Sequence, residues 1–263
     1  MSAWKIHQFG KKPILKNPIL IEGLPGIGNV GKVAVDFIID ELKAKKLYGF
    51  FSYTFPHSVF VNEKNLVELP SIDMYYKKTK NYDLLFLAGD VQPIDEVGSY
   101  EFSDMILDIA EEFKCSEIIT LGGIGLHEIP KHPKVYCTAN NKEIIKRYKK
   151  KVDINEKLYG VVGPIVGVSG LLIGLSKRRK IDAISLLAET FGHPMYLGVA
   201  GAKEILKVLE KKFDLDINLK KLEKEISDME SELIKKTKEL TDVSKTTAIK
   251  KIKSKFKDVN YIG

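Results

Sequence analysis

The sequence predicts an α/β fold: a three-layer sandwich with a mainly parallel central sheet, followed by a C-terminal α-helical extension. Three observations support this prediction. Apolar segments of strand length alternate with segments whose apolar residues repeat at a helical period. The strand-like segments are apolar throughout, as expected for a parallel sheet covered on both faces. After about Gly201 glycine disappears until the last residue, and lysine and glutamate dominate, which indicates a separate helical part.

The elements are expected in the following order along the chain. We expect buried strands at residues 18–23, 83–89, 117–121, near 160–165 and at 181–187, with two further β-rich runs at 47–55 and 57–76 that include a turn at 62–65. We expect helices at residues 29–46, 100–113, 141–149 and 168–178. The strand at 117–121 is expected to end in the glycines of residues 122–125.

The C-terminal part carries a heptad pattern. Its apolar positions are Leu215, Leu219, Leu222, Ile226, Met229, Leu233 and Leu240. The flanking positions are mostly glutamate, so a parallel self-pairing would place like charges together, whereas the following segment, 249–259, has basic flanks. We therefore expect an antiparallel helical hairpin folded at 241–247, with two independently packed helices as the alternative. The predicted division is a core domain at 1–202, a helical extension at 203–257 and a flexible tail at 258–263.

Composition limits the class of protein. The chain has only two cysteines, Cys115 and Cys137, and no N-terminal apolar run, so we expect a reducing, cytoplasmic environment. Its most apolar stretch, 161–175, is shorter than the roughly 20 residues of a membrane span. Much lysine, glutamate and isoleucine with little glutamine suits a heat-adapted protein.

The net charge of +7 comes from lysines that are not interleaved with aromatic residues. We therefore expect a solvated basic surface and not a nucleic-acid site, because nucleic-acid recognition usually relies on arginine and aromatic stacking.

A glycine loop follows the first buried strand. Gly26, Gly28 and Gly31 match the G-x-G-x-x-G pattern of dinucleotide sites, but residues 46–53 lack the acidic residue that would hold the ribose. The loop also matches a phosphate-binding loop as far as Lys32, but Val33 stands where a hydroxyl should bind magnesium. We therefore expect a structural loop built by Gly23, Gly26, Gly28 and Gly31, with no cofactor, although a helix N-terminus can hold an anion.

Other residues of catalytic type do not form a recognisable set. Ser169 lies in a sequence similar to a nucleophile elbow, but the second glycine is one position early and no acid or base can be matched to it. The spacing of the possible metal ligands His127, His132 and Cys137 fits no standard zinc pattern. The carboxylates near expected strand ends can serve acid–base chemistry or cap helices; they are Glu22, Asp90, Asp95 and Glu96.

Four blocks of this sequence resemble the proteasome assembly chaperone 2 family, especially its archaeal members. They are residues 18–32, 87–90, 117–123 and 168–174 followed by 183–189, and the resemblance covers about residues 13–240 in order. It implies a fold similar to that of nucleoside phosphorylases and hydrolases, with no known catalytic activity. It also implies a homo-oligomer that binds the 20S proteasome, especially its α subunits.

The C-terminus extends this resemblance. Some family members end in a hydrophobic residue, a tyrosine and any residue, and this tail enters pockets between α subunits. The present chain ends in Tyr261, Ile262 and Gly263, so its aromatic residue is third from the end. These three residues are the expected partner-binding site, and self-association is expected through the α/β body.

The leading hypothesis is therefore a proteasome assembly chaperone homologue without enzymatic activity. The alternatives are a nucleotide- or nucleoside-dependent enzyme that uses Gly26–Lys32 as a phosphate site, and a nucleic-acid-associated protein.

Overall fold

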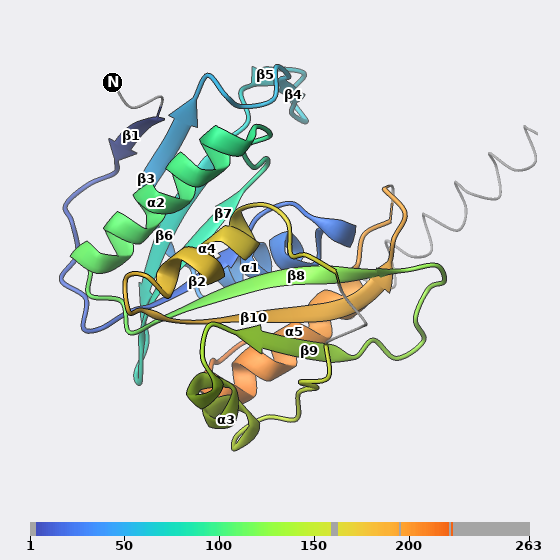
Figure 1. Cartoon of the computed structure of the whole chain (residues 1–263). Helices are drawn as coiled ribbons and strands as arrows, with labels where there is room; N and C mark the ends of the chain where they lie inside the picture. The colour runs from blue at the N-terminus through green and yellow to red at the C-terminus, as the bar shows by residue number, and fades with distance from the viewer. Residues whose placement is uncertain (1–3, 159–162, 195, 221, 223–263) are drawn as a thin grey trace, which may run out of the picture. The chain divides into compact units, whose positions relative to one another are not determined.

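The structure, a computed structural model, describes residues 4–158, 163–194, 196–220 and 222. Its centre is an eight-stranded sheet in the order β1-β3-β6-β7-β2-β8-β10-β9 (Figure 1). The strands are β1 Trp4–Gln8, β2 Ile19–Gly23, β3 Lys45–Ser52, β6 Ile72–Lys78, β7 Asp83–Gly89, β8 Glu117–Leu126, β9 Val135–Ala139 and β10 Asp182–Phe191. Four neighbouring strands, β7, β2, β8 and β10, run parallel, and antiparallel strands extend the sheet on both sides. The predicted α/β fold is confirmed.

Helices form a layer on each face of this sheet. Figure 1 shows α2 (Glu96–Glu112) and α4 (Val168–Ser176) on one face, and α1 (Val30–Glu41) and α5 (Val199–Phe213) on the other. The short helix α3 (Lys142–Lys149) contacts β9 and β10, and the single turn η1 (Ile27–Asn29) precedes α1. The apolar strands are thus covered on both sides, which explains why they lack the alternation of a half-exposed sheet.

The core on the α2 and α4 side is continuous from helix to sheet. Phe102 and Ile106 of α2 and Leu172 of α4 belong to one buried cluster with Leu20 of β2 and Ile118 of β8. Burying such side chains contributes about 1.5–3 kcal/mol each. The fold of the central strands therefore follows directly from the apolar pattern of the sequence.

Several expected boundaries were wrong. Helix α1 ends at Glu41, not at residue 46, because Lys43 has the left-handed φ of 50° and β3 begins at Lys45. Helix α2 begins four residues before the expected Tyr100, because the side chain of Asp95 caps it by accepting a hydrogen bond from the backbone N–H of Gly98.

Two strand predictions also need correction. β8 does not end at Leu121 but continues through the glycines to Leu126, paired with β10. The expected strand near 160–165 is absent at residues 163–165, which have no regular structure, while residues 160–162 lie outside the described part of the chain. The edge strand β9 had not been predicted.

A small two-stranded sheet stands apart from the main one. It consists of β4 (Phe60–Val61) and β5 (Val67–Glu68), and Figure 1 shows it beyond the end of β3. Its turn lies where the sequence predicted it: the backbone N–H of Asn65 donates to the carbonyl of Asn62 at 2.9 Å.

The α/β body extends further than the predicted boundary at residue 202. Helix α5 packs on α1 and β10 and buries Ile205, Leu206 and Leu209, and the compact unit continues to Leu219. Residues 215–218 have no regular structure, so Leu215 does not belong to a heptad helix. The predicted helical hairpin, from residue 223 onwards, and the tail Tyr261–Gly263 lie outside the described residues.

Candidate functional site

The glycine loop between β2 and α1 brings backbone segments together. A Cβ atom on Gly31 would lie 2.3 Å from the carbonyl oxygen of Leu121, and one on Gly23 would lie 2.2 Å from that of Gly31. Helix α1 therefore approaches β2 and β8 more closely than any side chain would allow. Gly28 has a φ of +60°, and a Cβ there would meet Thr190 at 2.7 Å. Only Gly26 of these four glycines has open space around it.

This close approach also explains the glycines of β8. A Cβ atom on Gly123 would lie 2.3 Å from the carbonyl oxygen of Ile27, so the glycine lets the loop rest on the strand. The prediction that the glycines of β8 end the strand is wrong: they lie inside it, where the backbone of the glycine loop packs against it.

Lys32, the lysine of the phosphate-loop pattern, faces carboxylates. Its Nζ lies 2.9 Å from an oxygen of Asp36 and 3.5 Å from one of Asp90. Asp90 in turn accepts hydrogen bonds from the backbone N–H and the hydroxyl of Ser71. The charge of this lysine is thus balanced within the protein.

Glu22 is the most unusual group at the carboxyl end of the parallel strands. Its side chain is fully buried, and its Oε1 accepts hydrogen bonds from the backbone N–H of Leu24 at 3.0 Å and from the hydroxyl of Ser169 at 3.2 Å. Its Oε2 has no hydrogen-bond partner among the described residues. Burial raises the pKa of Glu22 to about 7, against the lowering effect of these two hydrogen bonds.

The pair of Glu22 and Ser169 joins residues that are 147 positions apart. A carboxyl with a pKa near neutrality beside a hydroxyl can accept a proton, so the pair has the composition of a general base and a nucleophile. Both residues are of catalytic type in the sequence, but no spacing in the sequence connects them. A single acidic residue at the end of an otherwise apolar strand was the available sign of its burial.

The side chain of Gln92, from the loop after β7, contacts the first residue of α4. Its Nε2 donates to the carbonyl of Pro25 at 2.6 Å, and its Oε1 accepts from the backbone N–H of Val168 at 3.2 Å. A Cβ atom on Gly167, whose φ is +85°, would lie 2.4 Å from this same oxygen. Gln92 therefore links the glycine loop to α4. Its side-chain oxygen accepts a hydrogen bond from a backbone N–H at the start of the helix, where a nucleophile elbow would leave such N–H groups free to bind a substrate.

The remaining candidate residues are carboxylates at a helix start and possible metal ligands. Asp95 caps α2, and Glu96 is the first residue of that helix. The part of the chain that the structure describes, which includes His127, His132 and Cys137, contains no group of three or more His, Cys, Asp or Glu side chains able to hold a metal. Both cysteines are free. No helix in the described ranges has the length and apolar character to cross a membrane.

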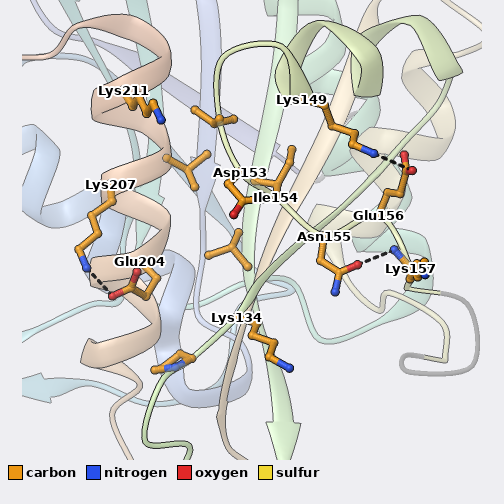
Figure 2. A pocket seen from close by; sticks show the side chains of 14 residues that line it. Lys134, Lys149, Asp153, Ile154, Asn155, Glu156, Lys157, Glu204, Lys207 and Lys211 are labelled. Atoms are coloured by element: carbon orange, nitrogen blue, oxygen red, sulfur yellow. Dashed lines mark hydrogen bonds and ion pairs between the residues drawn. The ribbon is translucent and has the colours of Figure 1, made fainter.

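A pocket of about 700 Å³ lies between α5, β9 and residues 149–157. Figure 2 shows lysines around its rim, two of which pair with carboxylates: Lys149 with Glu156 and Lys207 with Glu204. Asp153 lies among them. The rim is therefore only weakly basic, and the pocket is separate from the glycine loop and from Glu22.

Comparison with known proteins identifies the family. Residues 20–236 match the model of the PAC2 family. The chain belongs to the PAC2 family. The predicted resemblance is confirmed, and this PAC2 protein can be compared with relatives of known structure.

The crystal structure of Pyrococcus furiosus PbaB, an archaeal proteasome activator, is 36% identical, with a TM-score of 0.81 over 89% of this chain and 99% of PbaB. P. furiosus PbaA, an archaeal homolog of proteasome-assembly chaperone, is 22% identical with a TM-score of 0.75 over 99% of this chain and 100% of PbaA, which shows the shared fold. A Methanocaldococcus jannaschii protein described as uncharacterized is 32% identical over 95% of this chain and 93% of its own length.

Proposed function

We propose that this PAC2 protein is a proteasome assembly chaperone homologue that binds α subunits or rings of the 20S proteasome. The observation that carries the proposal is the 36% identity to an archaeal proteasome activator, over an alignment that covers 89% of the chain. Proteasome binding would place the protein in the cytoplasm.

The geometry of the glycine loop supports a binding protein over an enzyme. Gly23 and Gly31 serve backbone packing, and Lys32 is neutralised by Asp36 and Asp90. We infer that the loop formed by Gly23, Gly26, Gly28 and Gly31 is structural, that the protein uses no cofactor and that it acts through its surfaces.

The proposed contact with the proteasome is the tail formed by Tyr261, Ile262 and Gly263. An aromatic ring followed by an aliphatic side chain suits an apolar pocket between two subunits, because both side chains remove apolar surface from water when they bind. An anchor of this kind contributes about 2 kcal/mol or more when it sits at the centre of a contact.

Removal of residues 261–263 tests this contact. Binding to purified α subunits should weaken at least about tenfold, since 1.4 kcal/mol corresponds to one decade. The thermal stability of the α/β body should not change. Unchanged affinity would show that the tail does not hold the partner.

Capture from native lysate tests the function as a whole. The full-length chain should retain proteasome subunits in stoichiometric amounts after washing at moderate salt. Recovery of nucleic acid, or of no stoichiometric partner, would contradict the proposal.

We also propose that the protein self-associates through the α/β body. Because α5 belongs to that body, a truncation that tests this must begin at residue 220 and not at 203. The protein without residues 220–263 should keep its number of subunits, and a monomer would contradict the proposal.

The pair of Glu22 and Ser169 supports one alternative, a nucleotide- or nucleoside-dependent enzyme that uses Gly26–Lys32 as a phosphate site. A carboxyl with a pKa of about 7 at the carboxyl ends of parallel strands is typical of a catalytic group. The full burial of Glu22 argues against this alternative, because a general base must reach the proton that it removes.

A further inference from the structure

The pocket between α5, β9 and residues 149–157 has an apolar floor beneath a charged rim. The side chains of Val152, Ile154 and Val208 line it and are buried. The charged residues that line it are exposed, except for the half-buried Glu204. Its volume of about 700 Å³ is within the range of ligand sites in proteins. The pocket therefore has room for a ligand that carries both apolar and charged groups.

Backbone hydrogen bonds hold the walls of this pocket in place. The segment after α3 pairs with β9: the N–H of Cys137 donates to the carbonyl of Asn155 at 2.8 Å, and the N–H of Asn155 donates to that of Val135 at 2.9 Å. Lys134 is tied to Glu189 of β10, because its N–H donates to the Glu189 carboxylate and its carbonyl accepts from the Glu189 N–H, both at 3.0 Å. The backbone of the rim is thus fixed before any ligand binds.

The rim carries more positive charge than it neutralises. Five lysines and three carboxylates line the pocket, and two lysines pair with two of the carboxylates, as Figure 2 shows. The third carboxylate, that of Asp153, has no ion pair within the described ranges. The lysines whose side-chain amines have no ion pair or hydrogen bond to any described residue are Lys134, Lys157 and Lys211. An excess of two positive charges therefore lines the pocket.

The three unpaired amines come from three different parts of the fold. Lys134 precedes β9, Lys157 belongs to the segment after α3, and Lys211 is in α5. On α5, Lys211 shares one helix face with Lys207 and Val208, at spacings of four and three residues. Figure 2 shows the α5 lysines on one side of the pocket and Lys157 on the opposite side. The positive charges are therefore distributed around the apolar floor.

This arrangement suits separate carboxylates better than one compact phosphate group. No arginine lines the pocket, and neither helix presents its N-terminal N–H groups to it, because α5 contributes residues from Glu204 onwards and α3 contributes only its last residue, Lys149. Phosphate sites typically rely on such donors. Lysine amines are single point charges, and several of them around an apolar floor match carboxylates that flank an apolar side chain.

We propose that this pocket binds a peptide segment of a partner protein in which acidic side chains flank apolar ones. Its apolar side chains cover the floor formed by Val152, Ile154 and Val208, and its carboxylates accept charge-assisted hydrogen bonds from the unpaired lysines. The contact is independent of the proposed proteasome contact, which consists of the tail residues 261–263. Either of the two can fail without the other.

A fluorescein-labelled, capped peptide of sequence Glu-Leu-Glu-Glu-Leu-Glu is the probe, and fluorescence anisotropy with the full-length chain measures its affinity. Lys157→Gln combined with Lys211→Gln should weaken binding about fivefold, as expected for the loss of two exposed charge pairs. Asp153→Asn should strengthen binding about twofold, because it removes a like charge from the rim. These side chains are exposed, so the variants should fold, which circular dichroism checks.

The matched control is Lys80→Gln combined with Lys177→Gln. It removes the same charge from two exposed lysines that do not line the pocket, so the affinity for the probe should not change. Equal weakening in the two double variants would show that only the net charge of the protein attracts the probe, and would overturn the inference. No measurable binding of the probe to the wild-type chain at about 500 μM would also overturn it.

Two further measurements examine the ligand chemistry and the place of binding. A probe with serine in place of both leucines should bind at least about fivefold more weakly, because the floor is apolar. Carbodiimide, which couples a carboxylate to an amine in contact with it, should attach the probe to Lys134, Lys157 or Lys211, as mass spectrometry reads out. Coupling only to lysines outside the pocket would overturn the inference. Displacement of the probe by equimolar ATP would assign the pocket to phosphate ligands and would overturn it as well.

Discussion

The glycine loop and the β4–β5 hairpin both follow strands that end at the same edge of the sheet, yet they differ in how closely they pack against the rest of the protein. The glycine loop is packed so closely that a single added carbon on Gly31 would meet a carbonyl oxygen at 2.3 Å. The hairpin buries no side chain of its strands.

This contrast indicates where function lies. The loop whose sequence resembles a ligand site is filled by the protein itself, and its lysine is paired with Asp36 and Asp90. The hairpin has no catalytic residue pattern, but it offers apolar surface that no layer of the described residues covers, as is typical of a protein contact. The carboxyl edge of the sheet, which forms the ligand site in many α/β enzymes, is therefore better suited here to protein contacts.

Substitution of the glycines should separate packing from ligand binding. Gly31→Ala places a Cβ against the backbone of β8, which cannot move cheaply, so the free energy of unfolding should fall by about 3 kcal/mol despite the better helix propensity of alanine. Gly26→Ala, the control, meets no atom within 4 Å and should change it by less than about 0.5 kcal/mol. Chemical denaturation measures both values, and equal tolerance of the two substitutions would mean that the loop is not a packing device.

Glu22→Gln should stabilise the protein at high pH. The folded-state pKa of Glu22, about 7, lies above the ordinary value of 4.5, so the folded state favours the protonated form. The associated stability is present below pH 4.5 and is lost as the pH rises through 7. The glutamine should therefore raise the free energy of unfolding by about 3 kcal/mol at pH 9, with a difference near zero at pH 4. A destabilised variant at pH 9 would indicate that the ionised carboxylate has a partner in the folded state.

The hairpin should tolerate substitutions that the glycine loop does not. Val61 and Val67 lie directly opposite each other and are 66% and 69% exposed. Val61→Glu combined with Val67→Lys therefore places an ion pair across the strands and removes no buried contact, so the free energy of unfolding should change by less than about 0.5 kcal/mol. Chemical denaturation measures this value, and a loss as large as that of Gly31→Ala would mean that the hairpin packs against the body.

The smallest expected effect is that of nucleotides. Addition of ATP with magnesium, or of NAD, should produce no saturable rise in Tm, because the loop lacks both the magnesium hydroxyl at Val33 and the acidic residue that holds a ribose. Micromolar stabilisation by either nucleotide that disappears in Lys32→Ala would restore the enzyme hypothesis.

The sequence was sufficient to predict the strands that are apolar throughout, such as β2 and β7, because burial on both faces leaves a clear pattern. It failed where long-range contacts decide the structure. The glycines of β8 were interpreted as the end of a strand because their role depends on Ile27, almost a hundred residues earlier. Helix α5 was assigned to the extension because its lysines and glutamates resemble those that follow it, although its buried face belongs to the body.

The candidate site shows the same limit. Glu22 and Ser169 were both identified, but a hydrogen bond between a strand end and a helix start has no local pattern. Gln92 was not identified because a glutamine in a loop has no distinctive spacing, and its role depends on Pro25 and Val168.

We propose that this PAC2 protein works by binding the proteasome. The most direct measurement is co-sedimentation of the labelled full-length chain with purified 20S proteasome cores and, separately, with free α subunits. We predict saturable binding to at least one of the two that persists in the Glu22→Gln and Lys32→Ala variants, since neither residue belongs to the proposed contact. The absence of binding to both partners at about 10 μM, well above the affinity range of specific complexes, would contradict the account.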